Sequence, residues 1–137
     1  MSRDSPGKGI GATPNIQSIW GKVYAPPWIA KADVAFRVLN DSMIPHIKKG
    51  FIVFFSKGRE VQGGQMGAAD VDGETYLCRV WKDNRGFILV FDNRKFERLE
   101  IHTADHRISI IGPVAGWLSP SEQERIQKEY KEWRLVE

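Results

Sequence analysis

Hydrophobic residues along this chain recur mainly with the two-residue period of β-strands. Val34, Phe36 and Val38 stand at every second position, and residues 51–55 (Phe-Ile-Val-Phe-Phe) form a continuous apolar run of strand length. Further strand-like segments are found at 19–23, 73–81, 87–91, 99–101 and 107–117. About seven short strands without a helix between them predict a mainly β domain, with a compact curled sheet or a barrel-like fold.

Turn residues divide this pattern at defined places. The sequence Asn84-Arg85-Gly86 separates two strand-like segments, so residues 75–91 predict a β-hairpin. Gly112-Pro113 interrupts the last segment and predicts a bend or a bulge there.

The two ends of the chain depart from the β pattern. Residues 1–15 are rich in Gly, Ser and Pro, which predicts a flexible arm or the remains of a linker before a β domain at 16–118. Ser119-Pro120-Ser121-Glu122 carries a Ser-x-x-Glu capping box with proline at the first helical position. Residues 119–137 therefore predict a C-terminal amphipathic helix, whose apolar stripe is formed by Ile126, Tyr130 and Trp133. That stripe would pack on its own domain or against a second copy or partner.

Composition narrows the class of protein. The 137 residues are 42% hydrophobic, which suffices for one domain with its own core. A single cysteine excludes an intrachain disulfide and fits a reducing compartment. No apolar run reaches the ~20 residues of a membrane helix, and the first residues lack the apolar segment of a signal peptide. We therefore expect a cytoplasmic protein without a membrane span and without a cofactor.

The small basic surplus is concentrated in one region. The net charge is +3, and residues 79–98 contain six basic and three acidic side chains with Trp81 and Phe96 between them. Such a segment could follow a phosphate backbone or form an ordinary solvated sheet face. The candidate phosphate contacts are Lys82, Arg85, Arg94 and Lys95. A helix-turn-helix pattern is not found, so we do not expect this chain alone to read a DNA sequence.

The sequence contains two possible metal-binding motifs, but each lacks what a metal site needs. His102 and His106 are four residues apart, but they lie between two strand-like segments in what we expect to be a turn. Residues 70–74 begin like a calcium loop, yet the later ligands are missing and a strand follows at once. We therefore expect no metal site.

The most unusual passage runs from Phe36 to Gly50. A strand leads into Asn40-Asp41-Ser42, which is suited to cap a short helical turn, and Pro45 prevents a regular helix from continuing. Ser42 is thus expected at a strand-to-turn corner, as either a nucleophile or a capping serine.

This passage resembles the Ser-Met-x-Pro nucleophile motif of the LexA-like proteins, the S24 peptidase family of SOS repressors, phage repressors and UmuD-like proteins. The resemblance extends in order and spacing over about residues 17–117. Its pieces are Phe36–Leu39, Asn40–Pro45, Lys49-Gly50, Phe51–Phe55, Asp72–Glu74, Leu77–Val80, Phe87–Phe91, Asn93 and Ile111–Val114. It implies a LexA-type fold.

The resemblance also implies a Ser/Lys dyad, in which a neutral lysine takes the proton of the nucleophilic serine. Ser42 stands at the nucleophile position, but Cys78 stands where the family has its lysine base. A thiol in apolar surroundings keeps its proton. Arg79 is always charged and is expected on the opposite sheet face.

The cleavage loop departs from the family pattern as well. The family's Ala-Gly bond corresponds to Ala25-Pro26 here, and an imide bond is a poor peptidase substrate. Asn40 and Phe51 replace the usual Gly and Asp. We expect a regulatory and dimerisation domain of a LexA-like or phage-type transcription repressor that has lost self-cleavage. Its expected partners are a second copy and, through a separate N-terminal domain, DNA. The alternatives are an active serine peptidase using Ser42 and a stand-alone UmuD-like accessory protein.

Overall fold

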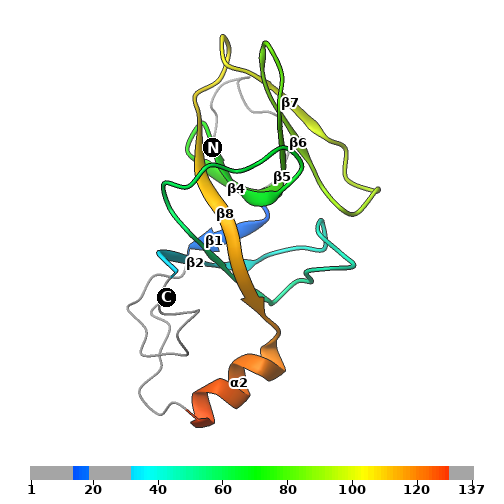
Figure 1. The fold of residues 1–137 in the computed structure, drawn as a ribbon. Coiled ribbons are helices and arrows are strands. Elements are labelled where there is room, and N and C mark those ends of the chain that lie inside the picture. Colours follow the sequence, from blue (N-terminus) through cyan, green and yellow to red (C-terminus); the bar gives the residue numbers. More distant parts are fainter. Residues whose placement is uncertain (1–13, 19–31, 130–137) are drawn as a thin grey trace.

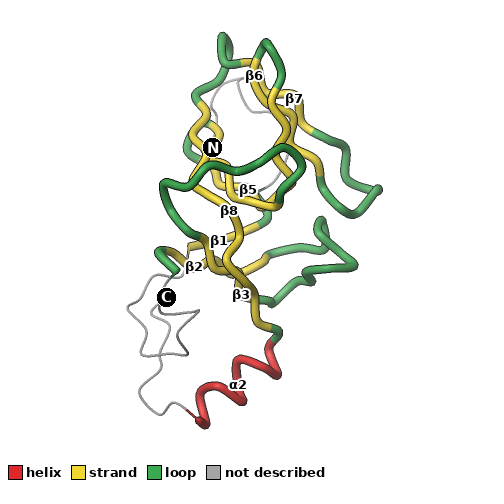
Figure 2. Tube along the Cα trace, viewed as in Figure 1, coloured by secondary structure: helices red, strands yellow, loops and turns green. Residues whose placement is uncertain are grey.

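The structure is a computed structural model of the chain, and it describes residues 14–18 and 32–129. The described elements are shown in Figures 1 and 2. They are β1 (Ile16–Ser18), β2 (Val34–Val38), β3 (Ile52–Phe55), β4 (Met66–Val71), β5 (Glu74–Lys82), β6 (Gly86–Val90), β7 (Leu99–His102), β8 (Ile108–Leu118) and α2 (Pro120–Glu129). The prediction of a mainly β domain with a C-terminal helix is confirmed.

All neighbouring strands pair antiparallel, in the order β1-β2-β3-β8-β4-β5-β6-β7. The sheet is curled, and among the described strands β1 and β7 are its two edges. The prediction of a compact curled sheet is confirmed, and the sheet does not close, because β1 and β7 do not pair with each other. The predicted hairpin is confirmed as β5 and β6.

The long strand β8 connects two halves of the sheet. Its residues 108–113 pair with β4, and its residues 114–118 pair with β3. The register shifts on both sides of Gly112-Pro113, which confirms the predicted bend or bulge. A Cβ atom at Gly112 would lie 1.7 Å from the carbonyl oxygen of Ser56, so only glycine fits at this close approach.

The strand β4 was not predicted. Its sequence is Met-Gly-Ala-Ala-Asp-Val, and all of its residues except Asp70 are buried. A strand that is buried on both faces between β5 and β8 shows no polar alternation, and its glycine and alanines have low β-propensity. A small residue is needed at Gly67, because a Cβ atom there would lie 2.9 Å from the Gly112 carbonyl oxygen of β8.

Two apolar clusters fill the fold. The larger one lies inside the curled sheet and includes Met43, Phe55, Tyr76, Cys78 and Leu89. The smaller one joins Ile126 of α2 to buried residues of the sheet, namely Ala35, Ile52, Phe54 and Leu118. Part of the predicted stripe thus packs on its own domain, while Tyr130 and Trp133 lie outside the described residues.

The beginning of α2 has the predicted capping box. The Ser119 hydroxyl accepts from the Glu122 amide at 3.2 Å, and the Glu122 carboxylate accepts from the Ser119 amide at 2.9 Å. The bond from the Ser119 amide to the carboxylate, followed by an interaction with the Ser119 hydroxyl, lowers the pKa of Glu122 below its usual value. Among the described residues, no helix is long and apolar enough to cross a membrane.

Candidate functional site

Ser42 lies in the turn between β2 and β3, which its own polar residues hold in shape. The Ser42 amide donates to the side-chain oxygen of Asn40 at 3.0 Å, and the Lys49 amide donates to Asp41 at 3.1 Å. The Gly50 amide closes the turn on the carbonyl of Val38 at 2.9 Å. The bonds to the Asn40 and Asp41 side chains are of the Asx type that is common at turns. Ser42 thus lies in a turn that follows a strand, as the sequence predicts.

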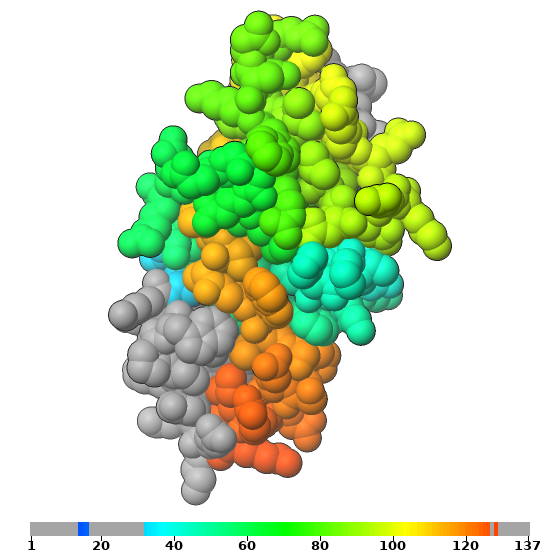
Figure 3. Space-filling model, turned by 45° about the vertical axis from the view of Figure 1, so that its right-hand side comes forward, coloured from blue at the N-terminus to red at the C-terminus, as the bar shows by residue number. Residues whose placement is uncertain are grey.

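A second loop holds the same turn from outside. The backbone amide of Asn93 donates to the Ser42 carbonyl at 2.9 Å, and its side-chain amide donates to the Asp41 carbonyl at 3.0 Å. Figure 3 shows the turn (turquoise) beside the loop after β6 (yellow-green) on the surface. Both backbone and side chain of Asn93 therefore fix the position of Ser42.

The Ser42 side chain points inward and has no exposed surface. Its neighbour Met43 is also fully buried, and so is Ile47 in the next turn. The Ser42 hydroxyl oxygen accepts a hydrogen bond of 2.8 Å from the side-chain amide of Asn15. Among the described residues, no lysine side chain hydrogen-bonds to Ser42, and Lys48, Lys49, Lys57 and Lys82 are all exposed.

Asn15 contacts Ser42 although the sequence did not predict it. Its side chain is 1% exposed, and its Nδ2 also donates to the Leu77 carbonyl at 2.7 Å. Its Oδ1 accepts from the Leu77 amide at 2.7 Å. The pairing of β5 with β6 ends at Arg79, so Leu77 has a free backbone edge, and the Asn15 carboxamide takes the place of the missing strand. A single asparagine beside the glycine-rich arm gives no sequence signal of such a long-range contact.

Cys78 follows Leu77 on β5 and is fully buried. Burial raises the pKa of its thiol far above the usual range, so the sulfur stays protonated. Its thiol contacts the carbonyl of Tyr76 at 3.9 Å. The side chain at position 78 of β5 is therefore a neutral and weakly polar thiol.

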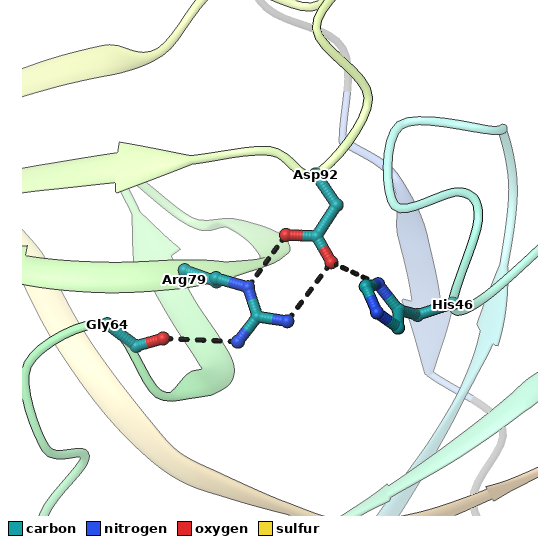
Figure 4. Close-up of polar contacts among 4 residues, drawn as sticks. All are labelled: His46, Gly64, Arg79 and Asp92. Carbon is teal, nitrogen blue, oxygen red and sulfur yellow. Dashed lines mark hydrogen bonds and ion pairs between the residues drawn. The ribbon is translucent and has the colours of Figure 1, made fainter.

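Arg79 points away from Cys78 into a polar cluster (Figure 4). Its Nε and Nη2 donate to the two oxygens of Asp92 at 2.7 and 3.2 Å, and its Nη1 donates to the carbonyl of Gly64 at 3.2 Å. The bond to Asp92 raises the pKa of the guanidinium further above its usual value. Asp92 has a 9% exposed side chain, and its Oδ2 lies 2.8 Å from His46 Nδ1. This cluster ties the Ser42 turn, through His46, to β5.

The four candidate phosphate contacts fall into two pairs. Lys82 and Arg85 lie at the β5–β6 turn, whereas Arg94 and Lys95 lie in the loop after β6. The pairs are thus at opposite ends of β6 and do not form one patch. Lys82 instead has its ammonium 6.0 Å from the ring centre of Phe87. Ala25 and Pro26 lie outside the described residues.

Three of the candidate metal residues, His106, Asp72 and Asp70, have structural partners. His106 Nδ1 lies 2.7 Å from Asp72 Oδ2, and the other oxygen of Asp72 accepts from the Arg107 amide at 2.9 Å. These bonds lower the pKa of Asp72 below its usual value. Asp70 accepts from the Gly73 amide at 2.9 Å, which confirms that residues 70–74 form a turn. In the described part of the chain, no three His, Cys, Asp or Glu residues gather as a metal-binding group.

Comparison with known proteins supports the resemblance of the Ser42 passage. No curated protein matches this chain. The family model described as Peptidase S24-like matches residues 3–115, which include Ser42, Cys78 and most of the curled sheet. Because this match covers most of the chain, the protein belongs to the Peptidase S24-like family.

Proposed function

We propose that this chain is a regulatory S24-like domain that does not cleave itself. The single observation that carries the proposal is the environment of Ser42. Its hydroxyl is fully buried and receives a hydrogen bond from the Asn15 side-chain amide, a group that cannot accept a proton. A serine becomes a nucleophile only when an adjacent base removes its proton.

The position of the family's lysine supports the same proposal. Cys78 occupies it, and burial keeps the thiol protonated. The neighbouring Arg79 is bound by Asp92 and remains charged. Neither Cys78 nor Arg79 can therefore accept the proton of Ser42. The expected cleavage bond, Ala25-Pro26, is in addition an imide, which is a poor substrate for serine peptidases.

The regulatory role that we propose is that of the self-associating domain of a LexA-like or phage-type transcription repressor. In such an arrangement DNA would be read by a separate N-terminal domain, and this domain would hold two copies together. Sedimentation equilibrium of the purified chain measures the association directly. We expect a dimer, and a monomer at high protein concentration would contradict this part of the proposal.

Prolonged incubation at alkaline pH tests the loss of cleavage, because a high pH favours the neutral form of any lysine base. We expect intact-mass spectrometry to find the wild-type chain and the Ser42→Ala variant equally intact. Background hydrolysis would appear equally in both proteins. A fragment ending at Ala25 that forms in the wild type and not in Ser42→Ala would overturn the proposal.

A further inference from the structure

A hollow of about 370 Å³ is lined by residues other than Asn15, Ser42 and Cys78. It forms where the connection between β3 and β4 passes over the sheet (Figure 1). The Gly58 amide fixes one end of this connection to the Ile111 carbonyl of β8 at 3.1 Å. The Gly64 amide fixes the other end to the Val80 carbonyl of β5 at 2.9 Å. Residues 59–63 arch between these two anchors, and the hollow lies against the arch.

The interior of the hollow is apolar. Val80 is buried, and Val61, Phe87 and Ile110 are partly buried residues that pack on the main core. They come from the connection, β5, β6 and β8, so the surface is held by paired strands on three sides. Because the burial of apolar surface is favourable, a ligand that covers these side chains would bind with a gain in affinity.

The rim of the hollow carries more positive than negative charge. Arg59 and Lys82 are exposed and form no ion pair with another described residue. Lys82 lies over the ring of Phe87, which places its ammonium beside the apolar interior. The one acidic lining residue, Glu60, accepts from the side chain of Gln62 at 3.3 Å. Two cations therefore remain available to an anion.

We propose that this hollow binds a small amphipathic anion, a molecule with an aromatic or aliphatic body and a single carboxylate. The body would cover Val61, Phe87 and Ile110, and the carboxylate would lie between Arg59 and Lys82. The volume is at the lower end of the ~300–1,000 Å³ of small-molecule sites, which suits one or two fused rings. This site goes beyond the proposed function, since it uses neither Ser42 nor Cys78 and does not depend on the loss of cleavage.

Nuclear magnetic resonance titration of the isotope-labelled chain tests the site with two probes, indoleacetate and indoleacetamide. These have the same ring body and differ in the charge of the carboxyl group. We expect indoleacetate to shift the amide signals of Val61, Val80, Phe87 and Ile110 saturably, and to bind about fivefold or more tightly than the amide. Equal binding of the two probes, or shifts confined to other residues, would overturn the proposal.

A matched pair of lysine variants locates the charge contact. Lys82→Gln removes a cation at the rim, and we expect it to weaken indoleacetate about fivefold while leaving indoleacetamide unchanged. Lys95→Gln removes an equally exposed cation at the opposite end of β6 and should leave both affinities unchanged. If the two variants weaken indoleacetate equally, the effect is one of net charge and the assigned site is wrong.

Discussion

Both polar atoms of the buried Asn15 side chain form hydrogen bonds: Nδ2 donates two and Oδ1 accepts one. One carboxamide completes the edge of β5 at Leu77 and also fixes the hydroxyl of Ser42. A buried backbone amide or carbonyl that loses its partner costs more than the same group at the surface, because water cannot replace the bond. The stability of the Ser42 site therefore depends on a residue far away in the sequence.

Asn15→Ala should be strongly destabilising. It leaves the Leu77 amide and carbonyl without partners, and we expect it to lower the free energy of unfolding by about 3 kcal/mol. Ser42→Ala removes only the hydroxyl and should cost about 1 kcal/mol. Urea denaturation of both variants measures the difference. If Asn15→Ala cost no more than Ser42→Ala, the bonds to Leu77 would contribute nothing to stability.

The Cys78 thiol should resist thiol-reactive disulfide reagents in the folded protein. It is fully buried, and its raised pKa leaves almost no thiolate at mildly alkaline pH. We expect labelling at least about a hundredfold slower in the native chain than in urea, where the thiol returns to its usual pKa of about 8.5. Rapid labelling of the native chain, followed by absorbance, would show that β5 opens readily at this position.

At the scale of elements, Asp72 joins the turn between β4 and β5 to the loop that precedes β8. This residue has a positive φ of 52°, and its carboxylate bonds His106 and the Arg107 amide. Its pKa is lowered in the folded state, first by the His106 bond and then by the Arg107 bond. A lowered folded-state pKa stabilises the protein above the unfolded-state pKa, and this contribution is lost as the pH falls through the folded-state pKa.

Asp72→Asn is expected to matter at neutral pH and much less in acid. Asparagine tolerates the same backbone conformation, so the substitution removes mainly the charge. We expect the variant to melt below the wild type at pH 6 and the gap to narrow as the pH falls below the usual aspartate pKa of about 3.9 and then through the lowered folded-state pKa of Asp72. Thermal unfolding at several pH values measures the gap. A gap that stays constant across this range would contradict the proposed ionisation.

The elements differ in how clearly their sequences predict them. The β5–β6 hairpin and the start of α2 were predictable because local residues specify them, through Asn84-Arg85-Gly86 and the Ser119–Glu122 capping box. The strand β4 was not, since its Gly and Ala residues are selected by packing between two neighbours. Ser42 was found through a local motif, whereas the Asn15 contact joins residues 27 positions apart and has no local pattern.

At the scale of the whole molecule, β8 joins the β1–β3 half of the sheet to the β4–β7 half. Polar bonds also cross between the two halves, from Asn15 to Leu77, from Asn93 to Ser42 and from His46 to Asp92. Asp92 is the acidic residue in these three bonds. It binds Arg79, whose side chain is 34% exposed, and it also binds His46.

Asp92→Asn should weaken the contact between the two halves. It removes the charge that binds His46 across the two halves and Arg79 within one of them, and we expect a loss of about 2 kcal/mol in the free energy of unfolding. Glu100→Gln removes the acidic partner of the exposed Arg98 and should cost at most about 0.5 kcal/mol. Equal losses in the two variants, measured by urea denaturation, would show that the buried position of Asp92 adds nothing.

The central place of β8 also has a consequence for synthesis of the chain on the ribosome. Both β3 and β4 take β8 as a neighbour, although it follows them by dozens of residues. During translation the apolar strand β3 therefore keeps one edge unpaired until residue 118 has left the exit tunnel. Long-range pairing of this kind is slow and exposes strand edges to other chains. We infer that slow elongation through the β3–β8 interval would favour aggregation of the nascent protein.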